Sequence, residues 1–228
     1  MSGAGDKGLL IDLCTPKAAR YAVERWHYSQ AMPASFKVFR LGVWEDGSFT
    51  GCIIFGNGAS AMVHKQFGVS RFEVCELVRV ALRKHKIAVS KMIKLSLIKV
   101  KKYNPGLRLC VSFADPSEGH HGGIYQAGNW IYTGTSEPTI EYFFNGRWRH
   151  VTDVYKRPQI TKSVRDRLPT RRRRGKYRYV MPLDRKMRRQ LEALRKQYPV
   201  RLTSKESVAP ADQVGGGGVI PTVRLHNA

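Results

Sequence analysis

The residue types best suited to chemistry gather in one polar, glycine-rich stretch, 115–123. It holds two carboxylates and two neighbouring histidines, Asp115, Glu118, His120 and His121. Carboxylate and imidazole groups serve as general acids and bases, and in clusters they bind metal ions. We therefore consider Asp115 as a base, and Glu118, His120 and His121 as bases or metal ligands. Neighbouring histidines also occur in loops that have no chemical role.

Aromatic residues flank this stretch on two expected helices. His27 and Tyr28 end the first helix, and Tyr125 starts a short helix directly after the loop. A tyrosine can donate or accept a proton, and its ring can stack on a nucleobase. Aromatic residues at helix ends also commonly belong to the core, so both interpretations stay open.

A carboxylate and a guanidinium, Glu76 and Arg79, lie within an otherwise apolar strand. Such groups are costly in a buried strand unless they are paired or used. Residues three apart point to opposite faces of a regular strand, so a direct pair would require a bulge. The alternative is that each is satisfied separately at a strand end.

The elements that position these residues follow from turn, cap and periodicity signals. Thr15 followed by Pro16 predicts a helix start, and Ser90 predicts a second one. A helix between two apolar strands indicates a right-handed crossover and a parallel pair. We expect an α/β fold with a mixed sheet, with helices over 16–28, 90–103 and 124–129 and strands over 36–44, 49–55, 72–82, 107–113, 131–133 and 140–148.

Charge is the most informative bulk property. The 228 residues contain 40 Lys and Arg against 17 Asp and Glu, a net charge of +23. Residues 147–198 alone hold 19 basic and 4 acidic residues. Such an excess indicates a polyanionic partner or, less often, an anionic membrane surface. A solvated basic tail or a localisation signal is the alternative interpretation of the arginine run. The candidate DNA-binding residues interleave with aromatic ones and are Arg171, Arg172, Arg173, Arg174, Lys176 and Arg178.

Length and composition predict one ordinary domain with an extension. We expect a domain over 8–150, a basic nucleic-acid-binding extension over 151–200 and a flexible tail over 201–228. Four widely spaced cysteines favour reduced thiols that lie mostly in the core. No apolar run is long enough for a membrane span and the N-terminus lacks a signal-peptide core, which predicts a soluble, cytoplasmic protein without a membrane partner.

Three separated motifs together resemble one family. They are Trp26-His27-Tyr28, the strand segment 76–80 (Glu-Leu-Val-Arg-Val), and the run 112–132 that begins Ser-Phe-Ala-Asp. Over roughly residues 8–200 the chain resembles the Mom proteins of phages, which modify adenine in DNA to N6-carbamoylmethyladenine. The resemblance implies a divergent fold of the Gcn5-related N-acetyltransferase type, with a mostly antiparallel mixed sheet, and a protein that protects phage DNA from restriction in the cytoplasm of the infected host.

By resemblance, Asp115 and Tyr125 would be the central catalytic pair, with His27 and Tyr28 lining the site. The donor would lie along the strand edge formed by Glu76, Arg79 and Val80. Ser90 and Lys91, at the helix start, would hold its phosphate. Ordinary acetyltransferases of this fold carry a glycine-rich loop there, whereas residues 83–90 contain no glycine. Coenzyme A is therefore in question as the donor.

The chemistry of the product limits the donor further. Acetyl transfer to N6 would leave an amide, whereas the family's product carries a CH2 on the ring nitrogen and a terminal carboxamide. Glycyl transfer followed by rearrangement would give that product, and a glycyl-tRNA could then supply the glycyl group. An acyl-CoA donor and a metal-dependent route stay open. So do two other classes of function, a non-enzymatic DNA-binding protein and an N-acyltransferase acting on a protein or a small amine. The target adenine would be single-stranded or flipped out of the duplex.

Overall fold

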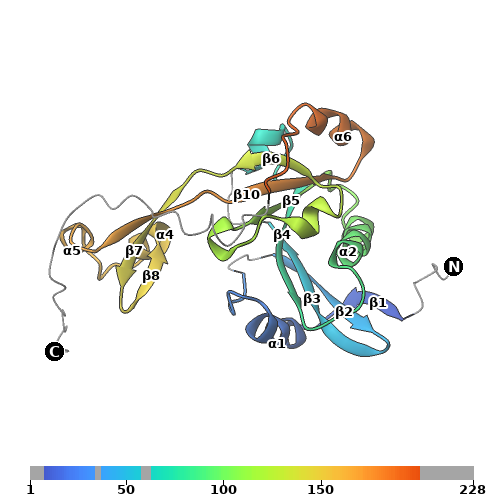
Figure 1. Ribbon diagram of the computed structural model, residues 1–228, viewed down its shortest axis with the longest axis horizontal. Helices are drawn as coiled ribbons and strands as arrows, with labels where there is room; N and C mark the ends of the chain where they lie inside the picture. The colour runs from blue at the N-terminus through green and yellow to red at the C-terminus, as the bar shows by residue number, and fades with distance from the viewer. Residues whose placement is uncertain (1–7, 34–36, 58–62, 201–228) are drawn as a thin grey trace.

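The computed structural model describes residues 8–33, 37–57 and 63–200. Its main body is a seven-stranded sheet in the order β1-β2-β3-β4-β5-β10-β6. Only β4 (Val74–Leu82) and β5 (Leu109–Ala114) pair in parallel; every other pair in this sheet is antiparallel. The mixed, mostly antiparallel α/β class predicted from the sequence is confirmed (Figure 1). The other strands of this sheet are β1 (Leu9–Leu13), β2 (Val38–Glu45), β3 (Ser48–Gly56), β6 (Ile131–Thr135) and β10 (Tyr177–Pro182).

Helices cover both faces of this sheet because β3 alternates its apolar residues between the two sides. Cys52 and Ile54 pack against α1 (Pro16–Trp26), whereas Ile53 and Phe55 pack in the cluster that includes α2 (Val89–Tyr103). Thr15 caps α1 by accepting a hydrogen bond from the Ala18 amide, as predicted. The predicted cap at Ser90 is wrong: α2 begins at Val89, and Ala88 occupies the cap position without a side-chain bond.

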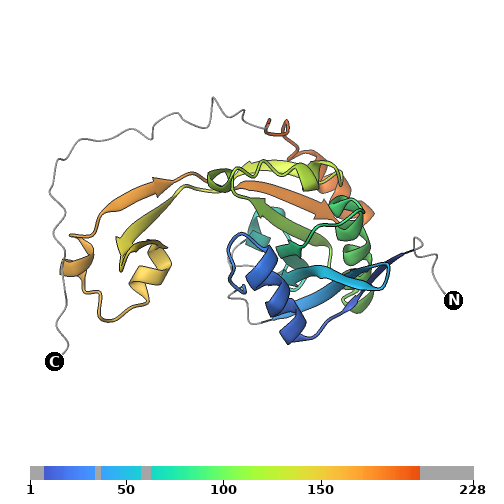
Figure 2. The same cartoon turned by 60° about the horizontal axis from the view of Figure 1, so that its bottom comes forward.

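A second, smaller unit projects from this body (Figures 1 and 2). We call residues 139–173 the lobe. Its sheet has the order β8-β7-β9, and it carries ten basic residues against three acidic ones. Its elements are β7 (Thr139–Phe144), β8 (Arg147–His150), α4 (Val151–Tyr155), α5 (Lys162–Arg165) and β9 (Thr170–Arg173).

The predicted boundary at residue 150 is wrong because the chain returns to the body after the lobe. β10 enters the main sheet between β5 and β6, and α6 (Arg185–Glu192) buries Met187 and Leu191 against the same sheet. The lobe is therefore an insertion between two neighbouring strands, and 151–200 is not a separate extension. The predicted tail, 201–228, lies outside the described residues.

Two short chain segments, 136–138 and 174–176, connect the body and the lobe, and we call them the neck (Figure 2). The Ser136 amide donates to the Lys176 carbonyl at 2.8 Å, and the Lys176 amide donates to Ser136 Oγ at 2.9 Å. Gly175 lies so close that a Cβ there would come within 1.8 Å of the Ser136 carbonyl oxygen. The two segments of the neck are thus held together by two hydrogen bonds and a close backbone contact.

We expect Gly175→Ala to weaken the neck because its methyl group would collide with the Ser136 carbonyl oxygen. Unlike a side chain, the backbone cannot relieve such a collision by changing rotamer. The variant should lose about 1–3 kcal/mol of unfolding free energy and should be cut faster within 136–176 in limited proteolysis. Gly106→Ala is the matched control, since nothing lies within 4 Å of a Cβ there. Equal stability of the two variants would show that the neck is loose.

Candidate active site

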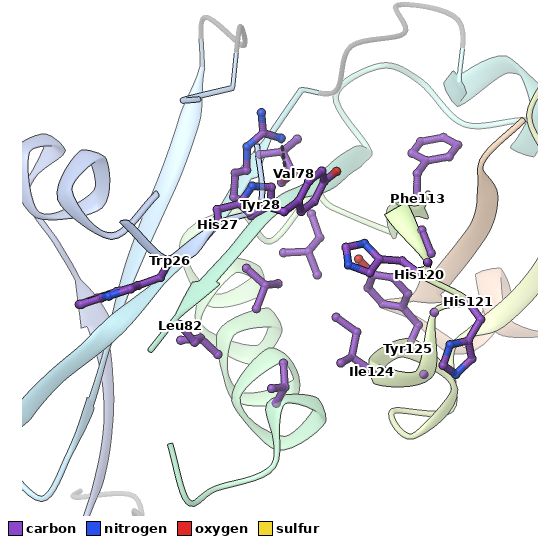
Figure 3. A pocket seen from close by; sticks show the side chains of 18 of the residues that line it. Trp26, His27, Tyr28, Val78, Leu82, Phe113, His120, His121, Ile124 and Tyr125 are labelled. Atoms are coloured by element: carbon purple, nitrogen blue, oxygen red, sulfur yellow. Dashed lines mark hydrogen bonds between the residues drawn. The ribbon is translucent and has the colours of Figure 1, made fainter. Parts of the chain in front are cut away.

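A cavity lies where the parallel strands part. β4 and β5 pair only over Val74–Glu76 and Leu109–Val111 and then diverge. The opening holds a cavity of about 670 Å³, lined by the outer halves of both strands, the end of α1 and the segment 119–125. Ligands of open α/β sheets bind at the carboxyl ends of parallel strands. The cavity is therefore the candidate active site (Figure 3).

Two walls bring together most of the side chains singled out in the sequence. His27 and Tyr28 stand on one side, and His120 and Tyr125 on the other (Figure 3). The Tyr28 and His120 rings meet edge to face at 5.1 Å between centroids. Arg79, Val80 and His121 also line the cavity. Segments separated by about 100 residues thus meet at this cavity.

His27 lies at the end of α1 with its Nδ1 engaged. The Ser29 amide donates to Nδ1 at 3.1 Å, and the Ser29 hydroxyl lies 2.8 Å from the same atom. An amide N–H can only donate, so Nδ1 is unprotonated and the neutral ring carries its hydrogen on Nε2. Burial, with the nearby Arg79 and His120, lowers the pKa of His27 to about 4. His27 is therefore a neutral hydrogen-bond donor at physiological pH.

Tyr125 is held at the point where the strands diverge. Its hydroxyl lies 2.8 Å from Ser112 Oγ, which donates to the Leu77 carbonyl at 2.8 Å. Because a serine has one hydrogen and the carbonyl can only accept, the tyrosine hydrogen points to Ser112. Burial raises the pKa of Tyr125. Tyr125 is therefore neutral, with its oxygen lone pairs available to accept from a substrate amine.

A bulge in β4 determines whether Glu76 and Arg79 lie on the same face of the strand. The register with β3 shifts so that Ile54 faces Arg79 and Phe55 faces Leu77. This extra residue puts Glu76 and Arg79 on one face of the strand. Burial lowers the pKa of Arg79, and the nearby Glu76 charge partly opposes that effect. Arg79 donates to the Ala31 carbonyl at 3.0 Å and thereby ties β4 to the segment after α1. Glu76 is not among the residues lining the cavity.

Asp115 is not among the lining residues either. It directly follows β5, is 3% exposed, and caps the short helix η2 (Pro116–Glu118) by accepting a hydrogen bond from the Ser117 amide at 3.0 Å. Its other oxygen is 2.9 Å from the Arg173 guanidinium and 3.4 Å from Lys176 Nζ. Both carboxylate oxygens thus have partners within the protein. Asp115 still lies near the cavity, because burial and then the Asp115 charge raise the pKa of Tyr28, which lines it.

The three metal candidates do not form a ligand cluster. Glu118 pairs with Arg173 at 2.8 Å, and His120 packs against Tyr28. In the part of the chain that the structure describes, no three His, Cys, Asp or Glu side chains come together as metal ligands. The described residues therefore do not fit a metal ion. The four cysteines are free thiols, three of them buried, as predicted.

The predicted donor-phosphate site is occupied by the protein's own carboxylate. Glu45 accepts hydrogen bonds from the Lys86 amide at 3.2 Å and the Ile87 amide at 2.8 Å, in the loop before α2. Backbone amides that precede a helix can bind a pyrophosphate. With Glu45 in place, the amides of Lys86 and Ile87 are not available to one. Ser90 and Lys91 do not line the active-site cavity but a second one, of about 750 Å³, along the outer side of α2.

The predicted DNA-binding residues fall into two groups. Arg172 and Arg174 are exposed, Lys176 is exposed beside Asp115, and Arg171 stacks on Trp148 at 4.5 Å and pairs with Glu141. Arg173 and Arg178 differ from this prediction because their guanidinium groups bind inside the protein. Arg178 donates to Thr133 Oγ1 at 2.9 Å and to Gln66, joining β10 to β6 and to η1 (Val63–Phe67).

Sequence reasoning missed several residues that organise the site. Tyr179 of β10 donates to the His121 carbonyl at 2.6 Å, and Gln126, in α3 (Gly123–Gln126), donates to Tyr179 at 3.0 Å. Glu141, buried in the lobe, pairs with Arg171 and Arg173. A glutamate between Ile140 and Tyr142 in a strand could have indicated a buried ion pair. Its partners lie about 30 residues later in the chain and could not be assigned from the sequence.

Comparison with known proteins assigns the family. A model of the Mom protein family matches residues 8–200, and the chain belongs to that family. None of the curated proteins compared with this chain matches it. No helix among the described residues is long and apolar enough to cross a membrane.

Solved acetyltransferase structures resemble the chain more distantly. An aminoglycoside acetyltransferase solved with coenzyme A and kanamycin is 10% identical, covering 81% of this chain and 98% of that one, with a TM-score of 0.47. An acetyltransferase of Elizabethkingia anophelis with acetyl-CoA bound is 12% identical over 78% and 100%, with a TM-score of 0.42. A spermidine N-acetyltransferase of Vibrio cholerae, with coenzyme A and spermine, is 10% identical over 78% and 96%, at 0.44.

The lowered pKa of His27 predicts a pH effect. Between about pH 6.5 and 4 the unfolded chain binds a proton that the folded chain excludes, so stability falls as the pH drops through this window. Nuclear magnetic resonance of the His27 ring should show a midpoint near 4, and Arg79→Gln should raise it because a nearby positive charge is removed. A midpoint near 6.5 in the wild type would contradict the burial of the ring.

The Glu45 contacts predict the response to phosphates. Glu45→Ala should lower the unfolding free energy by about 1–2 kcal/mol, while Glu24→Ala, which removes an exposed helical pair with Arg20, should cost less. Coenzyme A should raise the melting temperature of the Glu45→Ala variant but not that of the wild type, with ATP as a polyanion control. An equal coenzyme A response in both would show that Glu45 does not block the loop.

Proposed function

We propose that this protein is a phage enzyme that converts adenine in DNA to N6-carbamoylmethyladenine and so protects the DNA from restriction in the host cytoplasm. The observation that carries the proposal is the cavity of about 670 Å³ between the parting strands, with neutral His27 and Tyr125 on its opposite walls. Membership of the Mom family supports the same function.

The cavity suits a flipped base beside a small acyl group. Pockets of about 300–1,000 Å³ hold ligands of that size. The Tyr28 ring is 54% exposed and, with His120, offers aromatic surface to an unstacked base. Flipping costs a few kcal/mol, which phosphate contacts from the exposed arginines of the lobe offset.

The proposed reaction begins with glycyl transfer. The N6 amine attacks the carbonyl of an activated glycyl ester or thioester, the bond from that carbonyl to its carrier breaks, and the carrier leaves with a proton. In this step the Tyr125 oxygen accepts a hydrogen bond from the N6 amine. His27 donates from Nε2 to the carbonyl oxygen, where negative charge develops.

The second step is a rearrangement without oxidation or reduction. The free glycyl amine attacks C6 and closes a five-membered spiro ring that contains C6, N6, the carbonyl carbon, the CH2 and the amine nitrogen. The C6–N6 bond then breaks, a proton moves to N6, and N6 becomes the nitrogen of the carboxamide. The product has the same atoms as the glycyl intermediate and is N6-carbamoylmethyladenine.

Expression in bacteria tests the proposal. Nucleosides from the host DNA should contain, by mass spectrometry, an adenine species heavier by the carbamoylmethyl increment, absent when the protein is not made. Tyr125→Phe should reduce it at least tenfold, because it removes the hydroxyl that orients the amine. Tyr103→Phe is the matched control, since Tyr103 packs on Phe39 away from the cavity. Unmodified DNA, with a folded protein bound to it, would favour the binding-protein function.

The same experiment distinguishes the route and the carrier. In a purine-requiring host fed adenine labelled with 15N at N6, the label should end in the carboxamide, and label kept on C6 would overturn the rearrangement. Incubation of the purified protein with DNA and either glycyl-tRNA or glycyl-CoA should then give product with one of the two. Acetylation of a small amine or protein instead would indicate an ordinary N-acyltransferase.

A further inference from the structure

One guanidinium group joins the lobe to the active-site loop. Arg173, the last residue of β9, contacts Glu141 of β7 at 2.9 Å through one terminal nitrogen. Its other terminal nitrogen lies 2.9 Å from Asp115 and 2.8 Å from Glu118. The three carboxylates come from the lobe, from the end of β5 and from η2, so Arg173 is the point where these segments meet.

The burial of this cluster makes it a strong constraint. The Asp115 and Glu141 side chains are 3% and 7% exposed, and that of Arg173 is 23% exposed. Burial raises the pKa of Glu141, but hydrogen bonds from Arg171 and Arg173 outweigh it and lower the pKa overall. Loss of Arg173 would leave two buried carboxylates short of a partner, which is costly.

The loop that Arg173 restrains forms one wall of the cavity. We call residues 115–123 the cavity loop. The Asp115 carbonyl accepts from the His120 amide at 3.1 Å, and residues 119–123 line the cavity. Gly122 is in the left-handed region with φ of 88°, and a Cβ there would come within 2.2 Å of the Tyr179 ring, so the far end of the loop is also fixed.

We propose that Arg173 is a positioning residue that holds the cavity loop in a fixed relation to the lobe, so that a base on DNA bound by the lobe reaches the His120 wall of the cavity. This inference rests on the proposed function. It replaces the sequence-based assignment of Arg173 to phosphate binding, because its terminal nitrogens are already bound to carboxylates. It also makes Asp115 part of the same positioning cluster.

A comparison of Arg173 with its neighbour on the same strand tests the proposal. Arg172 is exposed and Arg173 is not. Arg173→Gln should leave the affinity for a short duplex within about threefold and the salt dependence unchanged, while the modification rate at saturating DNA falls at least tenfold, because misplacement of about 1 Å costs up to 100-fold. Arg172→Gln should weaken binding and reduce the salt slope by about one, a loss that more DNA restores.

The opposite pattern would overturn the proposal. If Arg173→Gln weakens DNA binding, lowers the salt slope and keeps its rate at saturation, Arg173 is a phosphate contact. Glu118→Gln is a second variant that should not disturb folding. It removes only the pair with Glu118, whose side chain is 40% exposed, and keeps both buried carboxylates paired. It should give a smaller fall in rate at unchanged affinity.

Hydrogen exchange separates this proposal from the proposed function. Arg173→Gln should speed amide exchange in 116–123 and leave α2 unchanged, whereas Arg172→Gln should change neither. This result is expected whether or not the wild type modifies adenine. Unchanged exchange in the cavity loop of a folded Arg173→Gln variant would overturn the positioning role even in an active enzyme.

Discussion

The active site depends on a parallel pair of strands that is hydrogen bonded for only three residues on each side. Beyond Glu76 and Val111 the two backbones diverge, and their polar groups must find other partners. One is supplied by Ser112, whose hydroxyl donates to the Leu77 carbonyl and accepts from Tyr125. The same short relay therefore satisfies the open sheet and sets the direction of the tyrosine hydrogen.

The buried ion pairs of this molecule gather around one guanidinium. The cavity is lined by aromatic side chains and by Arg79, whereas Arg173 pairs with Asp115 after β5 and with Glu141 in the lobe. Ion pairs are stronger away from solvent only when every charge has a partner. Arg173 meets this requirement for Asp115 and Glu141, so the net positive charge of the chain remains on exposed residues such as Arg172 and Arg174.

Local patterns predicted most elements of the first 135 residues because their signals are local. The cap at Thr15, the turn at 45–48 and the apolar runs of β4 and β5 each act within a few residues. β10 was missed because its basic neighbours indicated a solvated segment, although the consecutive apolar residues Tyr179, Val180 and Met181 are typical of a strand buried on both faces. Its placement between β5 and β6 is set by contacts more than 40 residues away, which no local pattern encodes.

The candidate active site shows the same division between features that the sequence indicates and features that depend on long-range contacts. The family resemblance implied site roles for His27, Tyr28, Arg79 and Tyr125, and these four residues line one cavity. The resemblance did not predict that Asp115 pairs with Arg173, or that Glu45 accepts hydrogen bonds from the amides before α2. Both contacts depend on which carboxylate lies nearest to a given donor in the folded chain. The spacing of residues in the sequence does not contain that information.

The insertion of the lobe between β6 and β10 also sets the order in which this protein becomes complete. During synthesis the body emerges first, but β5 and β6 cannot pair through β10 until the whole lobe has been made. The edges of β5 and β6 therefore stay open for the time that some 40 residues take to emerge, and closing them is a long-range step that slows folding. Among the described residues the last strand to be synthesised, β10, lies inside the main sheet, so the basic lobe is finished before the main body is.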